Sequence, residues 1–206
     1  VVLIFFWSLS LLFILKIREQ PNFYNFFLLG IFLGLAFLAK YAAIYFLISF
    51  ILILFFDLNL RRIFLIKISN TLIFLISLLV VLLPNIIWNI NNDLITIVHT
   101  SDNISLSKIT PNIIRGFEFL LIQALMLGIV ITIFSIYSFK KIRFDFETKF
   151  LLIFSLPIFF IIFIESVLVR ANANWAAVAL ISFFILIFHH TYKLSKKIIN
   201  INFFAN

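Results

Sequence analysis

The chain alternates long apolar runs with short polar segments. A helix that crosses a lipid bilayer needs about 20 mainly apolar residues, and several runs approach that length. The pattern therefore predicts an all-α protein: a polytopic transmembrane helical bundle of about seven spans, forming a single transmembrane domain over 1–206. The predicted spans are 1–15, 24–39, 41–56, 63–83, 117–138, 150–169 and 175–192.

The apolar stretch 24–56 allows two interpretations. As one helix it would be about 50 Å long at about 1.5 Å per residue, which is too long for one upright crossing. We predict two short helices that meet near the sequence LAKYAA, Leu38 to Ala43.

The distribution of basic residues supports seven alternating spans, the first running from outside to inside. Twelve of the 16 basic residues then lie in cytoplasmic segments: Lys16, Arg18, Arg61, Arg62, Lys67, Lys140, Lys141, Arg143, Lys149, Lys193, Lys196 and Lys197. The four on the external side are Lys40, Lys108, Arg115 and Arg170. This asymmetry follows the positive-inside rule, and it predicts that the longest loop, 84–116, is external.

Composition agrees with a membrane location. The chain is 65% hydrophobic with a mean hydropathy of +1.24, whereas soluble domains are about half apolar. Its formal charge is +8, but the basic residues sit in short clusters between apolar runs. That arrangement is typical of topology signals and lipid head-group contacts and does not point to nucleic acid. The chain begins with Val1 inside an apolar run, so we expect a portion of a longer protein.

The external loop concentrates polar side chains in an otherwise apolar sequence. Asn85 and Asn89 are four residues apart, so they share a helical face and could hydrogen-bond sugar hydroxyls. Trp88 suits a membrane interface, and Pro84 suits a helix end. The lone His99 is most simply a solvated side chain, although a role as a general base is open.

Two cations on the external side need an explanation other than topology. Lys40 would either bind a phosphate group or snorkel to the interface from the end of a span. In RANANW, Arg170 would bind phosphate bidentately beside Asn174 and Trp175, or it would mark the interface. The chain has no cysteine and no phosphate-binding, dinucleotide-binding or metalloprotease motif. We therefore expect neither a cofactor nor a metal.

The chain carries a series of motifs in this order: GLAFLAKY, LLPNIIWNINND with ITIVHT, FEFLLIQ and RANANWAAVAL. In the order of these motifs, the chain resembles the family 39 polytopic membrane glycosyltransferases. These include bacterial protein mannosyltransferases and lipid A aminoarabinose transferases. The resemblance covers roughly residues 30–185. It implies transfer of a sugar from a polyprenyl-phosphate carrier to an acceptor outside the cytoplasm, in the bacterial inner membrane. It assigns Lys40 and Arg170 to the carrier phosphate. The sugar or acceptor cleft would be formed by Asn85, Trp88, Asn89, His99, Asn174 and Trp175.

The chain departs from the family in one respect. Family members carry a catalytic acidic residue in a first external loop, and no such loop precedes the matched part. Asp93 and Asp102 are external carboxylates that match no catalytic position, so the catalytic residue is unknown. We expect the chain alone to transfer no sugar, and a separate N-terminal half to be a partner. Two alternatives stay open: a transporter or flippase for a lipid-linked or anionic substrate, and a structural membrane subunit.

Overall fold

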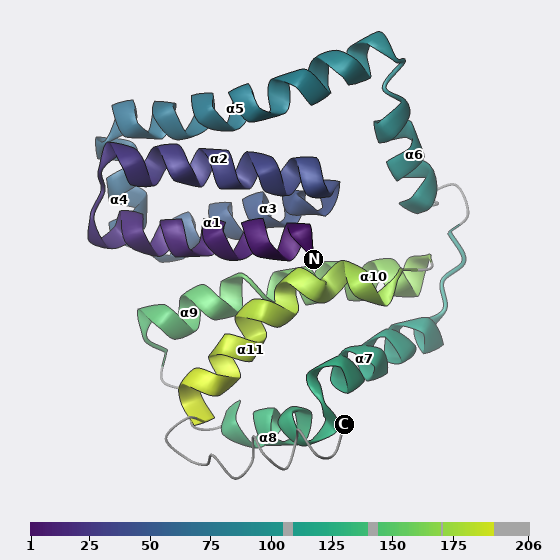
Figure 1. Cartoon of the computed structure of the whole chain (residues 1–206). Coiled ribbons are helices and arrows are strands. Elements are labelled where there is room, and N and C mark those ends of the chain that lie inside the picture. The colour runs from purple at the N-terminus through teal and green to yellow at the C-terminus, as the bar shows by residue number, and fades with distance from the viewer. Residues whose placement is uncertain (105–108, 140–143, 170, 192–206) are drawn as a thin grey trace. The chain divides into compact units, whose positions relative to one another are not determined.

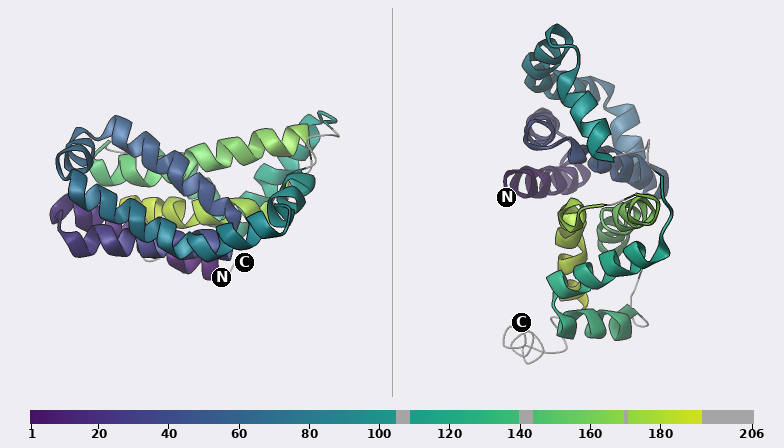
Figure 2. Two further views of the ribbon diagram at one scale, coloured as in Figure 1. Left: turned by 90° about the horizontal axis from the view of Figure 1, so that it is seen from above. Right: turned by 90° about the vertical axis from the view of Figure 1, so that its right-hand side faces the viewer.

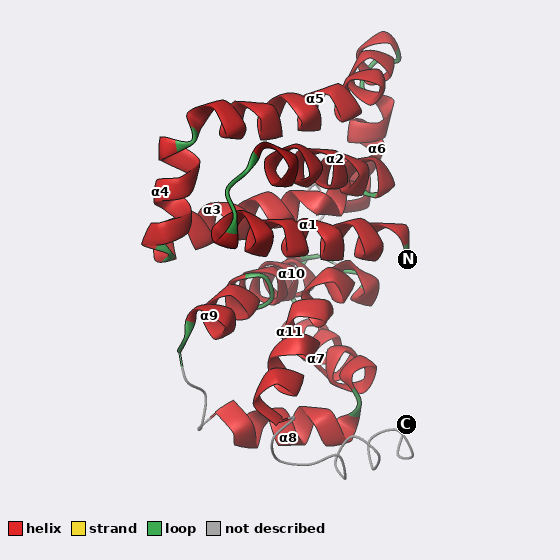
Figure 3. Cartoon of the chain, turned by 60° about the vertical axis from the view of Figure 1, so that its left-hand side comes forward, coloured by secondary structure: helices red, strands yellow, loops and turns green. Residues whose placement is uncertain are grey.

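The computed structural model describes residues 1–104, 109–139, 144–169 and 171–191, and within these it contains helices and loops but no strand (Figure 3). The chain divides into two compact units, Val1–Asn103 and Ile104–Asn206. The all-α prediction is confirmed for the described residues.

The first unit is built on a helical hairpin to which a third long helix is added. Helices α1, α2 and α5 run side by side (Figures 1 and 2), and α2 packs mainly on α5 and α1. The elements are α1 Val2–Glu19, α2 Phe23–Ala39, η1 Tyr41–Ala43, α3 Ile44–Phe56, α4 Leu58–Ile66, α5 Ile68–Asn91 and α6 Ile95–Ile104, which ends at the unit boundary.

Side-chain caps begin two of these helices. The Asn22 side chain accepts a hydrogen bond from Asn25 N at 3.0 Å and starts α2. The Asp57 carboxylate accepts one from Leu60 N at 2.7 Å and starts α4. Each cap satisfies a main-chain N–H that has no partner in the first helical turn. At Asp57 the chain bends by 104° between the α3 and α4 segments.

The second unit contains shorter helices. They are α7 Ile113–Leu127, α8 Ile129–Phe139, α9 Phe146–Ile153, α10 Leu156–Leu168, η3 Ala173–Ala176 and α11 Ala177–Thr191. Helix α7 packs on α10, and α11 packs on α9. The Asp145 carboxylate accepts a hydrogen bond from Thr148 N at 2.9 Å and caps α9.

The protein is an integral membrane protein. Two stretches in the described residues are long and apolar enough to cross a membrane: α5, and α9 with α10 as Phe146–Leu168. The bent pair Tyr41–Phe56 and Leu58–Ile66 would add a third if it is one span. The count of seven spans stays a prediction. The predicted break at Leu38–Ala43 is confirmed, because α2 ends at Ala39 and α3 begins at Ile44.

Three predicted boundaries were wrong. Helix α5 continues through Pro84 to Asn91, and α6 occupies part of the predicted loop 84–116. A proline removes only one hydrogen bond from a helix, and membrane helices tolerate that loss. The predicted span 117–138 is two helices, broken at Gly128, where φ is 92°. The predicted span 63–83 also included the end of α4, because the chain turns again at Lys67 before α5.

Candidate functional site

The candidate site of the first unit starts at Lys40, where α2 ends. Lys40 has extended backbone angles, φ −167° and ψ 135°, and its N–H donates to Ala36 O at 3.1 Å. Its carbonyl accepts from Ala43 N at 3.0 Å in the short helix η1. The side chain is exposed, and in the described part of the chain its ammonium group forms no ion pair. An exposed cation is thus carried on a main-chain turn that is held by hydrogen bonds.

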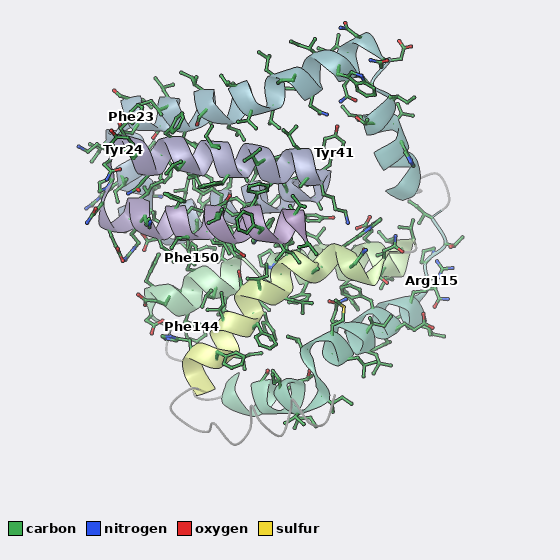
Figure 4. The ribbon with its side chains drawn as sticks, viewed as in Figure 1. Phe23, Tyr24, Tyr41, Arg115, Phe144 and Phe150 are labelled. Carbon is green, nitrogen blue, oxygen red and sulfur yellow. The ribbon has the colours of Figure 1, made fainter. Side chains whose placement is uncertain are left out.

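The residue after Lys40 connects this turn to two other helices. The Tyr41 hydroxyl donates to Asn85 Oδ1 on α5 at 3.1 Å, and it lies 2.8 Å from Thr96 Oγ1 on α6. Asn89 Nδ2 reaches the same hydroxyl at 3.4 Å. Tyr41 lies at the end of α2 opposite to Phe23 and Tyr24 (Figure 4). One phenol oxygen therefore joins η1, α5 and α6.

The two asparagines of α5 complete this group, which we call the Tyr41 network: Tyr41, Asn85, Asn89 and Thr96. Asn89 Nδ2 donates to Asn85 O at 3.0 Å and lies 3.3 Å from Asn85 Oδ1. Thr96 Oγ1 donates to Asn89 Oδ1. The shared helical face predicted for Asn85 and Asn89 is confirmed. Asn89 is only 3% exposed, so its geometry favours a positioning role over direct contact with a sugar.

The turn between α5 and α6 is held by the same part of α5. Asn89 O accepts hydrogen bonds from Asn92 N at 3.2 Å and from Leu94 N at 2.8 Å. Asp93 and Leu94 have φ values of 52° and 55°, a left-handed conformation that costs energy in residues other than glycine. The main-chain bonds to Asn89 offset this cost and fix the direction in which α6 leaves.

The remaining first-unit residues of the predicted site lie outside the network. Trp88 is 49% exposed, and its carbonyl accepts from Asn92 Nδ2 at 2.7 Å. His99 is exposed on α6. Both side chains can be reached from outside the unit. No cluster of three His, Asp or Glu residues suited to a metal ion occurs among the described residues.

In the second unit, the start of α7 is fastened to the end of α10. Thr110 N donates to Leu168 O at 3.0 Å, and Asn112 N donates to Val167 O at 2.8 Å. Ser166 Oγ donates to Arg115 O at 2.9 Å. The Arg115 guanidinium donates to Thr110 Oγ1 at 3.1 Å (Arg115 is labelled in Figure 4). Arg115, which the basic-residue pattern predicted to be external, thus folds back on its own loop.

The other second-unit candidates lie within the short helix η3. Asn174 is exposed and Trp175 is half-buried. Trp175 N donates to Asn172 O at 3.0 Å, which closes the turn. Arg170 lies outside the described residues. The structure thus joins Asn85 and Asn89 in one network and places Asn174 and Trp175 on one turn of the other unit.

Sequence reasoning assigned no role to Tyr41 or Thr96. Tyr41 adjoins the singled-out Lys40, and a phenol at a membrane interface usually finds a hydrogen-bond partner when buried. Thr96 is seven residues beyond Asn89. The two left-handed residues of the turn between them, Asp93 and Leu94, are not glycines, so the sequence did not reveal the turn. The contact between Thr96 and Asn89 therefore had no recognisable signature in the sequence.

Comparison with known proteins gives two matches. The family model described as dolichyl-phosphate-mannose-protein mannosyltransferase matches residues 1–88. The lipid A galacturonosyltransferase RgtD of Rhizobium johnstonii (strain DSM 114642 / LMG 32736 / 3841) is 30% identical over 185 residues, which are 88% of this chain and 38% of that protein. The chain thus spans about two-fifths of the length of this relative. No solved structure matches the chain.

Proposed function

Since the chain is homologous to the family 39 membrane glycosyltransferases, as its sequence motifs indicated, we propose that it acts in the transfer of a sugar from a polyprenyl-phosphate carrier to an acceptor outside the cytoplasm. The observation that carries this proposal is the exposed Lys40 on a turn fixed by the part-buried Tyr41 network. The family match over 1–88 includes Lys40, Tyr41 and Asn85. The proposed location is the bacterial inner membrane, with about seven spans and the network at the external side.

Lys40 is the proposed ligand of the carrier phosphate in the first unit. In the transfer, the acceptor oxygen forms a bond to the anomeric carbon and gives its proton to a base. The bond between the anomeric carbon and the phosphate oxygen breaks, and its electron pair stays on the phosphate. A nearby ammonium group stabilises this growing negative charge. Lys40 suits the role because its side chain is exposed while its main chain is held. Arg170 keeps its proposed role as a ligand of the carrier phosphate, from the sequence alone.

The residues proposed for the sugar or acceptor cleft fall into an exposed group, which could contact the ligand directly, and a more buried group. Trp88 and His99 are exposed in the first unit, and Asn174 is exposed in the second. An exposed indole offers a flat apolar face for a sugar ring, and an exposed amide or imidazole offers hydrogen bonds. Trp175 is half-buried beside Asn174 and would support it. Asn85 and Asn89 would act through the network, by holding Tyr41 and so the turn that bears Lys40.

The test is binding of a polyprenyl monophosphate to the 206-residue chain in lipid nanodiscs. A charge-assisted contact contributes about 1.5–3 kcal/mol, so Lys40→Ala should weaken binding by roughly 10- to 100-fold. Lys40→Arg keeps the charge and should bind within a few-fold of the parent. Lys149→Ala removes an exposed lysine of the second unit and should bind like the parent. Folding is checked by circular dichroism.

Arg170 is tested by the same assay. Arg170→Ala should lose affinity to a similar degree, and Arg170→Lys should recover only part of it, because lysine lacks the planar fork of arginine. Parental affinity in both Lys40→Ala and Arg170→Ala would make these residues interface anchors. The proposed phosphate site would then be wrong.

A further inference from the structure

Helix α4 has two unlike faces. Leu60 is fully buried and Phe64 is 5% exposed. The Phe64 ring contacts the rings of Phe26, Phe50 and Phe74, with centroids 4.9, 5.0 and 6.3 Å apart. The opposite face carries large apolar side chains that touch little of the unit: Leu58 is 56% exposed and Leu65 is 69% exposed.

Basic residues flank the apolar side chains on the outward face of α4. Leu58 and Leu65 are seven residues apart and therefore share one side of the helix. Arg61 and Arg62 follow Leu58 by three and four residues, so they lie on either side of this pair. Both arginines are exposed, as is Lys67 at the end of the helix. Residues 58–66 contain no acidic residue.

The direction of α4 is fixed at its first residue. The chain bends by 104° between the α3 and α4 segments, so α4 crosses the end of the first unit and does not continue along it (Figures 1 and 3). Arg18 at the end of α1 contacts the Asp57 carboxylate at 3.7 Å, and the same carboxylate caps α4. When α1, α2 and α5 stand across a bilayer, α4 lies in the plane of its surface.

We propose that α4 is an interfacial helix that binds the anionic phospholipid head groups of the leaflet at this end of the unit. Leu58 and Leu65 enter the outer part of the acyl region. Arg61 and Arg62 extend from either side of them to lipid phosphates, as long cationic side chains do at interfaces. The only acid at the start of α4, Asp57, is paired with Arg18, so the net positive charge of Arg61, Arg62 and Lys67 selects anionic over zwitterionic lipid. This inference does not rest on the proposed sugar transfer.

The experiment uses the full chain in nanodiscs of phosphatidylcholine. Because the chain has no cysteine, Leu65→Cys carries a single bimane label. Nitroxide-labelled phosphatidylglycerol or phosphatidylcholine is added at equal mole fraction, and quenching of the label is measured. Phosphatidylglycerol should quench several-fold more effectively. Arg61→Gln and Arg62→Gln should each weaken the affinity for phosphatidylglycerol by about fivefold, as expected for one basic residue at an anionic surface, and so remove most of this preference.

Matched variants distinguish an effect of the charges on α4 from an effect of the net charge of the chain. Lys149→Gln removes one exposed positive charge from α9 in the second unit and should leave the preference unchanged. Arg61→Lys and Arg62→Lys keep the charge and should retain the preference even if a glutamine variant folds poorly.

Three results would overturn the proposal. An unquenched label would place α4 in water. Equal quenching by the two lipids would mean apolar contact without head-group selection. Displacement of phosphatidylglycerol by trace polyprenyl monophosphate would assign this face to the carrier.

Discussion

Gly30 on α2 lies directly against Ser77 on α5. A Cβ atom at Gly30 would stand 1.9 Å from Ser77 Oγ and 2.4 Å from the carbonyl oxygen of Phe74. One turn later, a Cβ atom at Gly34 would stand 2.8 Å from Val81 Cβ. Glycines four apart let membrane helices approach closely. The hydroxyl of Ser77 then donates across this contact to Phe27 O at 3.2 Å.

Gly30→Ala should destabilise the first unit by about 1–3 kcal/mol, because a methyl group has no space between the helices. The measurement is unfolding of the purified chain in detergent. Ser77→Ala in the same chain should not restore stability, since the Phe74 carbonyl is main chain and stays in place. Ser8→Ala, on an exposed part of α1, is the control. Full recovery in the double variant would show that only the serine side chain opposes the methyl group.

The stability change caused by Gly128→Ala has opposite signs for a continuous helix and for a helix that is broken at Gly128. In a continuous helix over 117–138, as the sequence predicts, Gly128→Ala would stabilise the protein by about 0.5–1 kcal/mol. In the structure Gly128 has φ 92° and ψ 133°, which side-chain-bearing residues rarely adopt, so alanine should instead destabilise by about 1–3 kcal/mol. Chemical unfolding in detergent measures the sign. A more stable Gly128→Ala chain would favour the continuous helix.

The sequence predicted the helical class and the break before Tyr41, because apolar length and a lysine between apolar runs are strong local signals. It missed the break at Gly128, since a single glycine in an apolar run does not reveal its φ angle. It placed the end of α5 at Pro84, although neighbouring groups can compensate for a proline. The pairing of Asn85 and Asn89 followed from helical spacing. Their link to Tyr41 and Thr96 depends on tertiary packing.

Tyr41→Phe removes only the hydroxyl that joins Asn85, Asn89 and Thr96. The expected cost is about 1–3 kcal/mol, because the buried amide of Asn89 and the half-buried amide of Asn85 lose a partner. If the network holds the turn that bears Lys40, affinity for polyprenyl monophosphate should also fall. Tyr24→Phe is the control, since Tyr24 is 71% exposed at the other end of α2. Lower stability with unchanged affinity in Tyr41→Phe would restrict the network to a structural role.

The membrane orientation of the first unit can be tested with single cysteines, because the native chain has none. Asn91 ends α5 and is exposed, and Asn59 is exposed on α4. The positive-inside asymmetry predicts that Asn91 is external and Asn59 is cytoplasmic. An impermeant maleimide should therefore label Asn91→Cys in intact cells and Asn59→Cys only after the cells are opened.

The reverse pattern would place Lys40 and the Tyr41 network on the cytoplasmic side, because Tyr41 contacts α5 at Asn85, near the Asn91 end. The proposed external phosphate site would then be wrong, whereas the lipid contacts of α4 would move to the external leaflet. Labelling of both positions in intact cells would contradict a membrane crossing by α5. The double variant Asn59→Cys/Asn91→Cys gives an internal standard, since one labelled cysteine per chain is expected before the cells are opened and two afterwards.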